Sequence, residues 1–111
     1  MKSNVKELSG VTVIKLEGNV LGGPDAAELN NELHHLVEAK KKKIVIDLSS
    51  VSMMNSSGLG MLIAGVTTIR NAGGELKLAA ASAKVLNLLT VTKLISVFEH
   101  HDTVKAAVAS F

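Results

Sequence analysis

The chain has 111 residues, of which 47% are hydrophobic and 20% are charged, and it contains no cysteine. This length and composition indicate one globular domain over residues 1–111. The lack of cysteine excludes disulfides, thiolate chemistry and cysteine-based zinc sites, and it fits a reducing cytoplasm. Aromatic residues make up only 2% and the net charge is +2, so direct nucleic-acid binding is not indicated.

The longest uncharged stretch covers residues 48–69 and was tested as a membrane span. A spanning helix needs about 20 predominantly apolar residues. This stretch contains five serines and three glycines, which would place many polar groups in hydrocarbon. We therefore expect no membrane span.

The first part of the chain predicts two strands and a helix. Residues 11–17 are rich in β-branched side chains and mostly alternate, which is typical of a strand that Gly18 ends. Residues 5–8 are expected to form a short antiparallel partner. Pro24 suits the first turn of a helix, and apolar residues keep helical spacing to about residue 39. The lysine run 40–43 is interpreted as the end of that helix rather than as an anion-binding patch.

The middle of the chain predicts a buried strand followed by a loop and a helix. Residues 43–48 form a continuous apolar run between charged ends, as in a central strand covered on both faces. Residues 49–55 are expected to be a polar loop. Helical spacing of apolar residues then runs from Leu59 to Ile69, and Gly73 and Gly74 stop that helix.

The last part predicts a strand at 75–79, a short helix around 85–89, a final strand at 95–98 and a closing helix at 102–109. The alternation of strands and helices implies an α/β fold. We expect a mostly parallel central sheet of about five strands, flanked by about four helices.

The segment from Asp47 to Gly60 leads from a strand end into a helix, where ligands and partners tend to bind in open α/β sheets. Asn55, Ser56 and Ser57 are all good helix N-caps, and the sequence does not decide among them. A phosphate on Ser56 would lie at the positive end of the helix dipole, so the domain should tolerate it. A partner with an apolar or acidic surface should not. A plain cap is the alternative interpretation.

This segment resembles the signature of the STAS family, typified by bacterial anti-sigma factor antagonists. The resemblance rests on Asp47-Leu48 followed by the run from Met54 to Gly60, and on similar residues at 16–18, 43–48 and 72–76. It covers nearly the whole chain and implies a STAS fold.

The resemblance also implies a function. In that family the serine at the position of Ser56 is phosphorylated by a partner that is both anti-sigma factor and Ser kinase. The unphosphorylated form binds this kinase and frees the sigma factor, and a Ser phosphatase restores it. The family most often has Asp before this serine, whereas this chain has Asn55, which keeps capping geometry but removes a charge. The family further implies a monomer that forms a complex with its partner.

The expected partner surface surrounds Ser56. We place on it the loop before the first long helix and the helix face opposite Leu62. Met53, Met54 and Met61 either fill the core or contact the partner. The candidate partner-binding residues are Gly22, Asp25, Met54, Asn55, Ser56, Ser57, Gly58, Gly60, Met61, Ala64 and Thr68.

Two other classes of function remain. A STAS adaptor subunit of a transport or stress-signalling complex would use Ser56 only as a cap. An enzyme is not indicated, since the sequence has no nucleophile elbow, no phosphate loop and no histidine–glutamate pair at metal spacing. We expect no cofactor and no metal, although Asp47 was considered as a magnesium ligand at a strand end.

Overall fold

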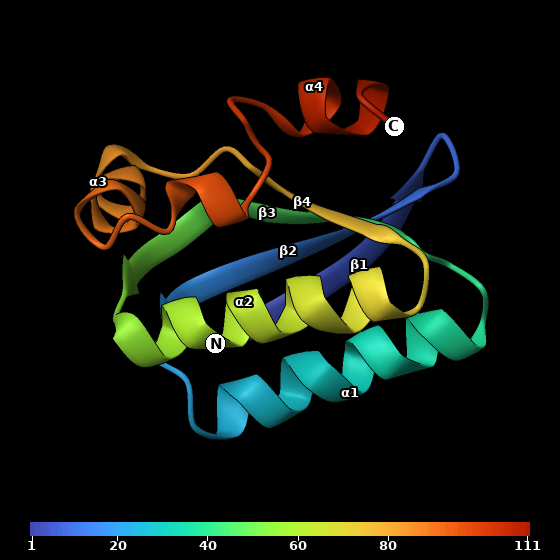
Figure 1. The fold of residues 1–111 in the computed structure, drawn as a ribbon, viewed down its shortest axis with the longest axis horizontal. Coiled ribbons are helices and arrows are strands. Elements are labelled where there is room, and N and C mark those ends of the chain that lie inside the picture. Colours follow the sequence, from blue (N-terminus) through green and yellow to red (C-terminus); the bar gives the residue numbers. More distant parts are fainter.

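Residues 1–111 are all described by the computed structural model, which contains one five-stranded sheet in the order β1-β2-β3-β4-β5. β1 (Lys2–Leu8) is antiparallel to β2 (Val11–Val20), and β2, β3 (Lys43–Met54), β4 (Glu75–Ala79) and β5 (His100–His101) are parallel. The helices are α1 (Pro24–Glu38), α2 (Ser56–Asn71), α3 (Ala83–Val91) and α4 (Val104–Ala109), with a 3-10 turn η1 (Ile95–Val97) before β5 (Figure 1). The predicted α/β fold class is confirmed.

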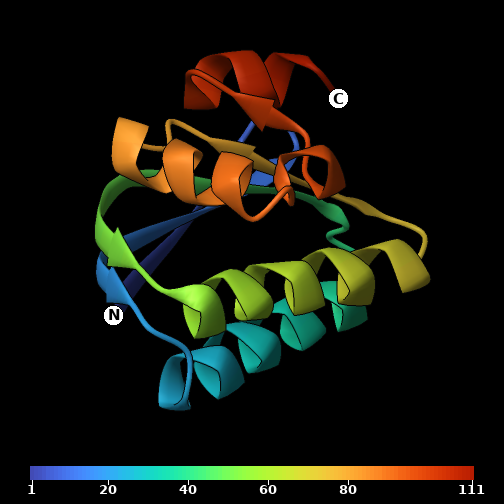
Figure 2. The same cartoon turned by 60° about the vertical axis from the view of Figure 1, so that its left-hand side comes forward.

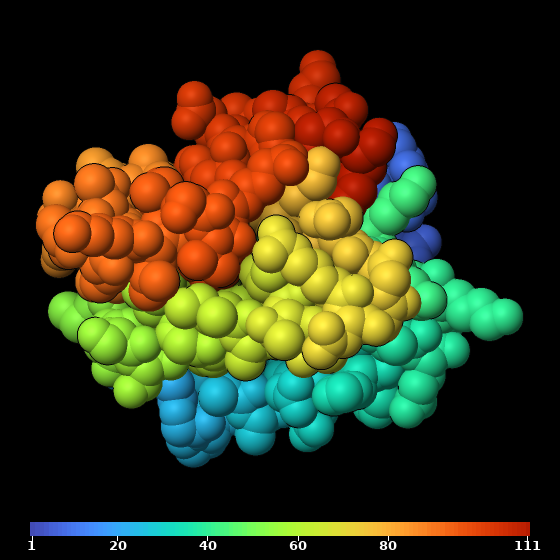
Figure 3. All heavy atoms as spheres, in the orientation of Figure 1, coloured from blue at the N-terminus to red at the C-terminus, as the bar shows by residue number.

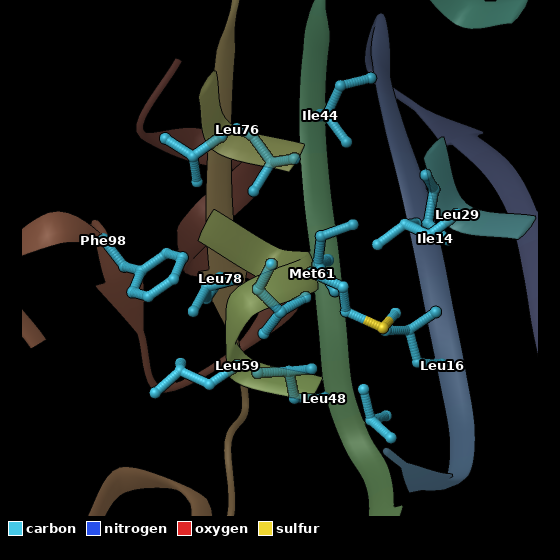
Figure 4. Close-up of a cluster of buried hydrophobic side chains, with 14 of the residues drawn as sticks. Ile14, Leu16, Leu29, Ile44, Leu48, Leu59, Met61, Leu76, Leu78 and Phe98 are labelled. Carbon is cyan, nitrogen blue, oxygen red and sulfur yellow. The ribbon is translucent and has the colours of Figure 1, made fainter. Parts of the chain in front are cut away.

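The two faces of the sheet are covered by different helices. α1 and α2 lie side by side over one face, and α4 lies over the other (Figure 2). The larger core lies under α1 and α2, where Ile14 and Leu48 of the strands meet Leu59 and Met61 of α2 (Figure 4). A smaller cluster lies under α4 and consists of Val11, Val13, Val45, Ala79 and Ala107. Helix amphipathicity thus explains the layers.

β2 and β3 extend further than the sequence predicted. Gly18 does not end β2, and residues 49–54 continue β3 instead of forming a loop. The reason is long-range pairing: Glu17 pairs with Ser50 and Val20 with Met54, with irregularities in register on both sides of Gly18. Gly18 has a φ of +87°, which a glycine adopts without strain.

The final strand was predicted at the wrong place. Residues 95–97 form η1, and the strand is the short β5 that follows. Phe98 packs into the larger core, whereas Ile95 is exposed, so this apolar run is not a half-buried strand. The sheet pairing begins at Glu99, whose carbonyl oxygen accepts a 2.8 Å hydrogen bond from the amide of Leu78.

The lysine run ends α1, as predicted. The amide of Lys41 donates a 2.8 Å hydrogen bond to the carbonyl of Leu36, and Lys40 has a φ of +61° at this helix terminus. Lys43 then begins β3. No helix in the chain combines the length and the apolar character that crossing a membrane requires.

Candidate functional site

The candidate site is built on the junction between β3 and α2. Asn55 has extended backbone angles and caps α2: its Oδ1 accepts a 2.7 Å hydrogen bond from the amide of Gly58. Its carbonyl oxygen accepts a 2.9 Å hydrogen bond from the amide of Leu59, the first bond of the helix. Of the three capping candidates, Asn55 therefore holds this role, and Ser56 and Ser57 are free for other interactions.

Ser56 and Ser57 occupy the first two positions of α2 and are exposed. Their backbone amides have no hydrogen-bond acceptor within the chain, as is usual in the first turn of a helix. That turn also contains no acidic residue. The positive end of the helix dipole is thus uncompensated, and two donors are available to an anion.

The loop between β2 and α1 packs directly against this helix start. A Cβ added to Gly22 would lie 2.7 Å from the Cβ of Ser57, and Gly22 has a φ of +81°. A Cβ added to Gly58 would collide with the carbonyl oxygen of Val20, which also accepts a 3.4 Å hydrogen bond from the amide of Asn55. The Gly22 loop therefore lies against the start of α2, next to Ser57. Figure 3 shows the start of α2, in green, at the surface between α3, in orange, and the loop before α1, in blue.

The structure decides between the two alternatives left open for the methionines near the site. Met54 and Met61 belong to the larger core and are only 9% and 5% exposed, so the placement of Met61 on the outer face of α2 is wrong. The side chain of Met61 instead turns toward the sheet (Figure 4). Met53 is 48% exposed beside the site, as is Leu21 at 42%. The sequence left Met53 open between core packing and partner contact and placed the loop of Leu21 near Ser56, and the structure shows that both side chains are exposed.

The outer face of α2 carries small residues beyond the site. Gly60 and Ala64 are exposed at four-residue intervals from Ser56, and Thr68 is half-buried. Ala64 also borders a shallow, mostly apolar groove of about 290 Å³ between α1 and α2. Its lining residues are Ala26, Ala27, Leu29, Asn30, Leu33, Met61, Ala64 and Gly65. The structure thus brings together Ser56, Gly60 and Ala64 on one face.

Charged groups near the site are few. Asp25 lies in the first turn of α1, 3.7 Å from the amino group of Met1. Asp47 is buried within β3 rather than at a strand end, and its Oδ1 accepts a 2.9 Å hydrogen bond from the amide of Ser49. No three histidine or carboxylate side chains come together in the chain as metal ligands would. Asp47, which was considered as a magnesium ligand, is not part of any such group.

The two ionisable groups with a shifted pKa, Glu99 and His100, lie next to and in the outer strand β5. The pKa of Glu99 is lowered to about 2 by hydrogen bonds from His101 and Lys77. The pKa of His100 is lowered because the ring is partly buried, although Asp102 opposes the shift. His100 accepts a 3.2 Å hydrogen bond at Nε2 from the amide of Ala81. These groups hold β5 and α4 in place rather than forming part of the Ser56 site.

The family follows from comparison with known proteins. Residues 2–107 match the family model described as "STAS domain", and the chain belongs to that family. A curated relative, BtrV of Bordetella bronchiseptica, is provisionally named an anti-sigma factor antagonist and is 26% identical over 100% of this chain and 95% of its own length.

Solved structures share the fold. The Bacillus cell fate determinant SpoIIAA in its phosphorylated form has a TM-score of 0.73 and 15% identity, with 98% of both chains covered. A sulfate transporter family protein from Wolinella succinogenes has a TM-score of 0.80 and 19% identity, with 93% of this chain and 85% of the other covered. At these identities the structural likeness establishes the architecture, and function has to be argued from the site.

Proposed function

We propose that this protein is an anti-sigma factor antagonist controlled by phosphorylation of Ser56. Its unphosphorylated form binds an anti-sigma factor that is also a Ser kinase, which releases the sigma factor. Phosphate on Ser56 ends this binding, and a Ser phosphatase restores it. The observation that carries the proposal is the exposed Ser56 hydroxyl at the first position of α2, beside amides without acceptors.

The local geometry favours Ser56 over Ser57 as the phosphate acceptor. The Cβ of Ser57 is packed against the backbone of Gly22, within the distance at which a side chain on Gly22 would collide with it. Ser56 occupies the first position of α2, and both serines are exposed. A kinase has to surround the acceptor hydroxyl, and the loop that packs against the Cβ of Ser57 leaves less room around that residue.

The phosphorylated domain should stay folded. A phosphoserine carries about −1.5 to −2 charges, and at Ser56 these would face the positive end of α2. The first turn holds no carboxylate to repel them. Asn55 keeps the cap without adding negative charge next to the phosphate, in contrast to the aspartate that the family more often carries there. Phosphorylation should therefore weaken binding of the partner and leave the domain folded.

The partner surface follows from exposure around Ser56. It consists of Ser56 and Asn55, the outer face of α2 at Gly60 and Ala64, and the exposed side chains of Leu21 and Met53. Gly22, Asp25, Ser57, Gly58 and Thr68 shape or border this surface. Burial removes Met54 and Met61 from direct contact. Apolar side chains beside small residues suit close packing of a partner, which a phosphate at the centre would disrupt.

Binding experiments with charge variants test the proposal. Ser56→Ala, Ser56→Glu and Ser96→Glu would be used to capture partners from the native cell lysate, with Ser96 as an exposed control site on η1. The switch requires that an ATP-binding Ser kinase is captured by the Ser56→Ala and Ser96→Glu proteins and lost with Ser56→Glu. Equal capture of transporter or scaffold subunits by all three would support an adaptor instead.

Reconstitution identifies the modified atom. The captured kinase, purified and supplied with ATP, should add one phosphate to the wild-type chain and to Ser57→Ala, and none to Ser56→Ala. Intact-mass measurement and fragmentation locate the phosphate. Modification of the Ser56→Ala protein to the wild-type extent would overturn the assignment of Ser56.

A further inference from the structure

β1 is an outer strand that is open along its whole length. Each of its seven residues is exposed, and no other segment lies beyond it in the sheet (Figure 1). The opposite outer strand, β5, has only two residues and is followed by α4. Two of the six large hydrophobic side chains that the chain exposes, Val5 and Leu8, are on β1. Long open edges of this kind are sites of strand pairing.

The hairpin fixes which backbone groups of β1 are free. Ser9 and Gly10 form a two-residue turn, both with positive φ, so Leu8 and Val11 close the hairpin as a hydrogen-bonded pair. The alternation of an antiparallel ladder then directs the amides and carbonyls of even-numbered residues toward β2. Those of Ser3, Val5 and Glu7 point outward, where no strand accepts them.

A second copy of β1 matches these outward groups in one symmetric register. A two-fold axis at Val5 places Val5 opposite Val5 and Ser3 opposite Glu7, so all three outward residues pair and six hydrogen bonds form. Lys2 then faces Leu8, and Asn4 faces Lys6. Moving the axis to Asn4 places Lys2 opposite Lys6, and moving it to Lys6 places two copies of Lys6 opposite each other. Like charges in direct opposition destabilise a strand pair.

We infer that the free edge of β1 is a self-association surface, on which a second copy of this chain adds its own β1 antiparallel about Val5. The two sheets become one sheet of ten strands. The axis lies on the outer side of β1, whereas Ser56 follows β3, two strands further into the sheet. The inference goes beyond the proposed switch, because it concerns a surface that the switch does not use, and it departs from the monomer that the family resemblance implies.

Val5→Pro tests the outward hydrogen bonds. Proline removes the outward amide of Val5 and fixes the φ of that residue, and it is tolerated on outer strands where the amide faces solvent. Sedimentation equilibrium of the wild-type chain should show a monomer–dimer equilibrium, and Val5→Pro should weaken it at least roughly tenfold. A wild-type chain that stays monomeric up to millimolar concentration would overturn the inference, as would equal association of the two proteins.

A charge exchange at Val5 tests the register and does not depend on the folding of the proline variant. Val5→Glu and Val5→Lys should each associate at least roughly tenfold more weakly than wild type, because like charges meet at the axis. An equimolar mixture should recover association, since glutamate then faces lysine. A mixture no stronger than either variant alone would contradict the Val5-centred pairing. If β1 pairs with an unrelated protein and not with a second copy of itself, mixing the two variants would not strengthen their association. That result would also contradict the inference.

Discussion

Gly22 and Ser57 are in such close contact that a Cβ on Gly22 would lie 2.7 Å from the Cβ of Ser57. This contact joins the loop before α1 to the start of α2. It packs the Cβ of Ser57 against the loop, while both Ser56 and Ser57 remain exposed. Under the proposed switch, Gly22 would therefore favour Ser56 over Ser57 as the phosphate acceptor, although Gly22 lies more than thirty positions earlier in the sequence.

Gly22→Ala should destabilise the protein by about 2 kcal/mol, because the residue has a φ of +81° and meets Ser57. Gly73→Ala is the matched control, since Gly73 has a φ of +84° but no atom within 4 Å of the added Cβ. Urea unfolding measures both. The loss should be larger for Gly22→Ala, and equal losses would show that the contact with Ser57 contributes nothing.

Asn55→Ala should lower the free energy of unfolding by about 1 kcal/mol, because the 2.7 Å hydrogen bond to the amide of Gly58 is lost. Asn55→Asp keeps an acceptor at the same place and should be at least as stable as the wild type, since its charge faces the helix N-terminus. Urea unfolding of the three proteins at neutral pH distinguishes them. An alanine variant as stable as the wild type would refute the capping role.

The structure shows why some features were predictable from sequence and others were not. α1 and α2 were found from the spacing of Leu29, Leu33, Leu62 and Val66, because helical periodicity is local. The extension of β3 to Met54 was missed, because it depends on pairing with residues 17–20 of β2. Its polar sequence, Ser49 to Ser52, resembles a loop when the partner strand is not considered.

The site was predicted in position but not in detail. The motif around Ser56 located the helix start, yet three residues there cap helices equally well, and only the geometry selects Asn55. On the outer face predicted for α2, Gly60 and Ala64 are exposed, but Met61 points toward the core. Exposure of Met53 follows from strand register, which no local pattern reports.

Gly58→Ala and Gly60→Ala form a matched pair on one helix. A Cβ at Gly58 would meet the carbonyl oxygen of Val20, whereas one at Gly60 has no atom within 4 Å. Gly58→Ala should therefore cost about 2 kcal/mol or more, while Gly60→Ala should add about 0.5 to 1 kcal/mol, because alanine is the better helix former. Thermal and urea unfolding measure the difference. Equal effects would mean that β2 does not pack against the helix start as described.

Glu99 should make the attachment of α4 sensitive to acid. Its carboxylate lies 2.9 Å from Lys77 Nζ and 2.7 Å from His101 Nε2. Lys77 in turn binds Oγ and the carbonyl oxygen of Ser110, at 2.7 and 3.1 Å, at the end of α4. Protonation of Glu99 would remove its ion pair with the buried Lys77. The hydrogen bonds from Lys77 to Ser110 hold the end of α4 against the sheet.

The direction of the pH effect follows from the pKa of Glu99, which falls from the ordinary 4.5 to about 2 on folding. The unfolded chain then binds the proton more tightly, so the contribution of Glu99 is complete above pH 4.5 and is lost as the pH falls toward 2. Because Glu99 is about half exposed, solvent screening keeps this contribution small. The stability gap between wild type and Glu99→Gln should be widest above pH 5 and should close toward pH 2.

Hydrogen exchange at Ala107, the buried residue of α4, gives a local measure of the same effect. In the wild type its protection should decline between pH 4.5 and 2 relative to that of Ile46 in β3, after correction for the intrinsic exchange rate. In Glu99→Gln the ratio should already be low at pH 5 and change little on acidification. Glu28→Gln, a control on the exposed side of α1, should follow the wild type. A constant ratio in the wild type would mean that Lys77 holds α4 without help from Glu99.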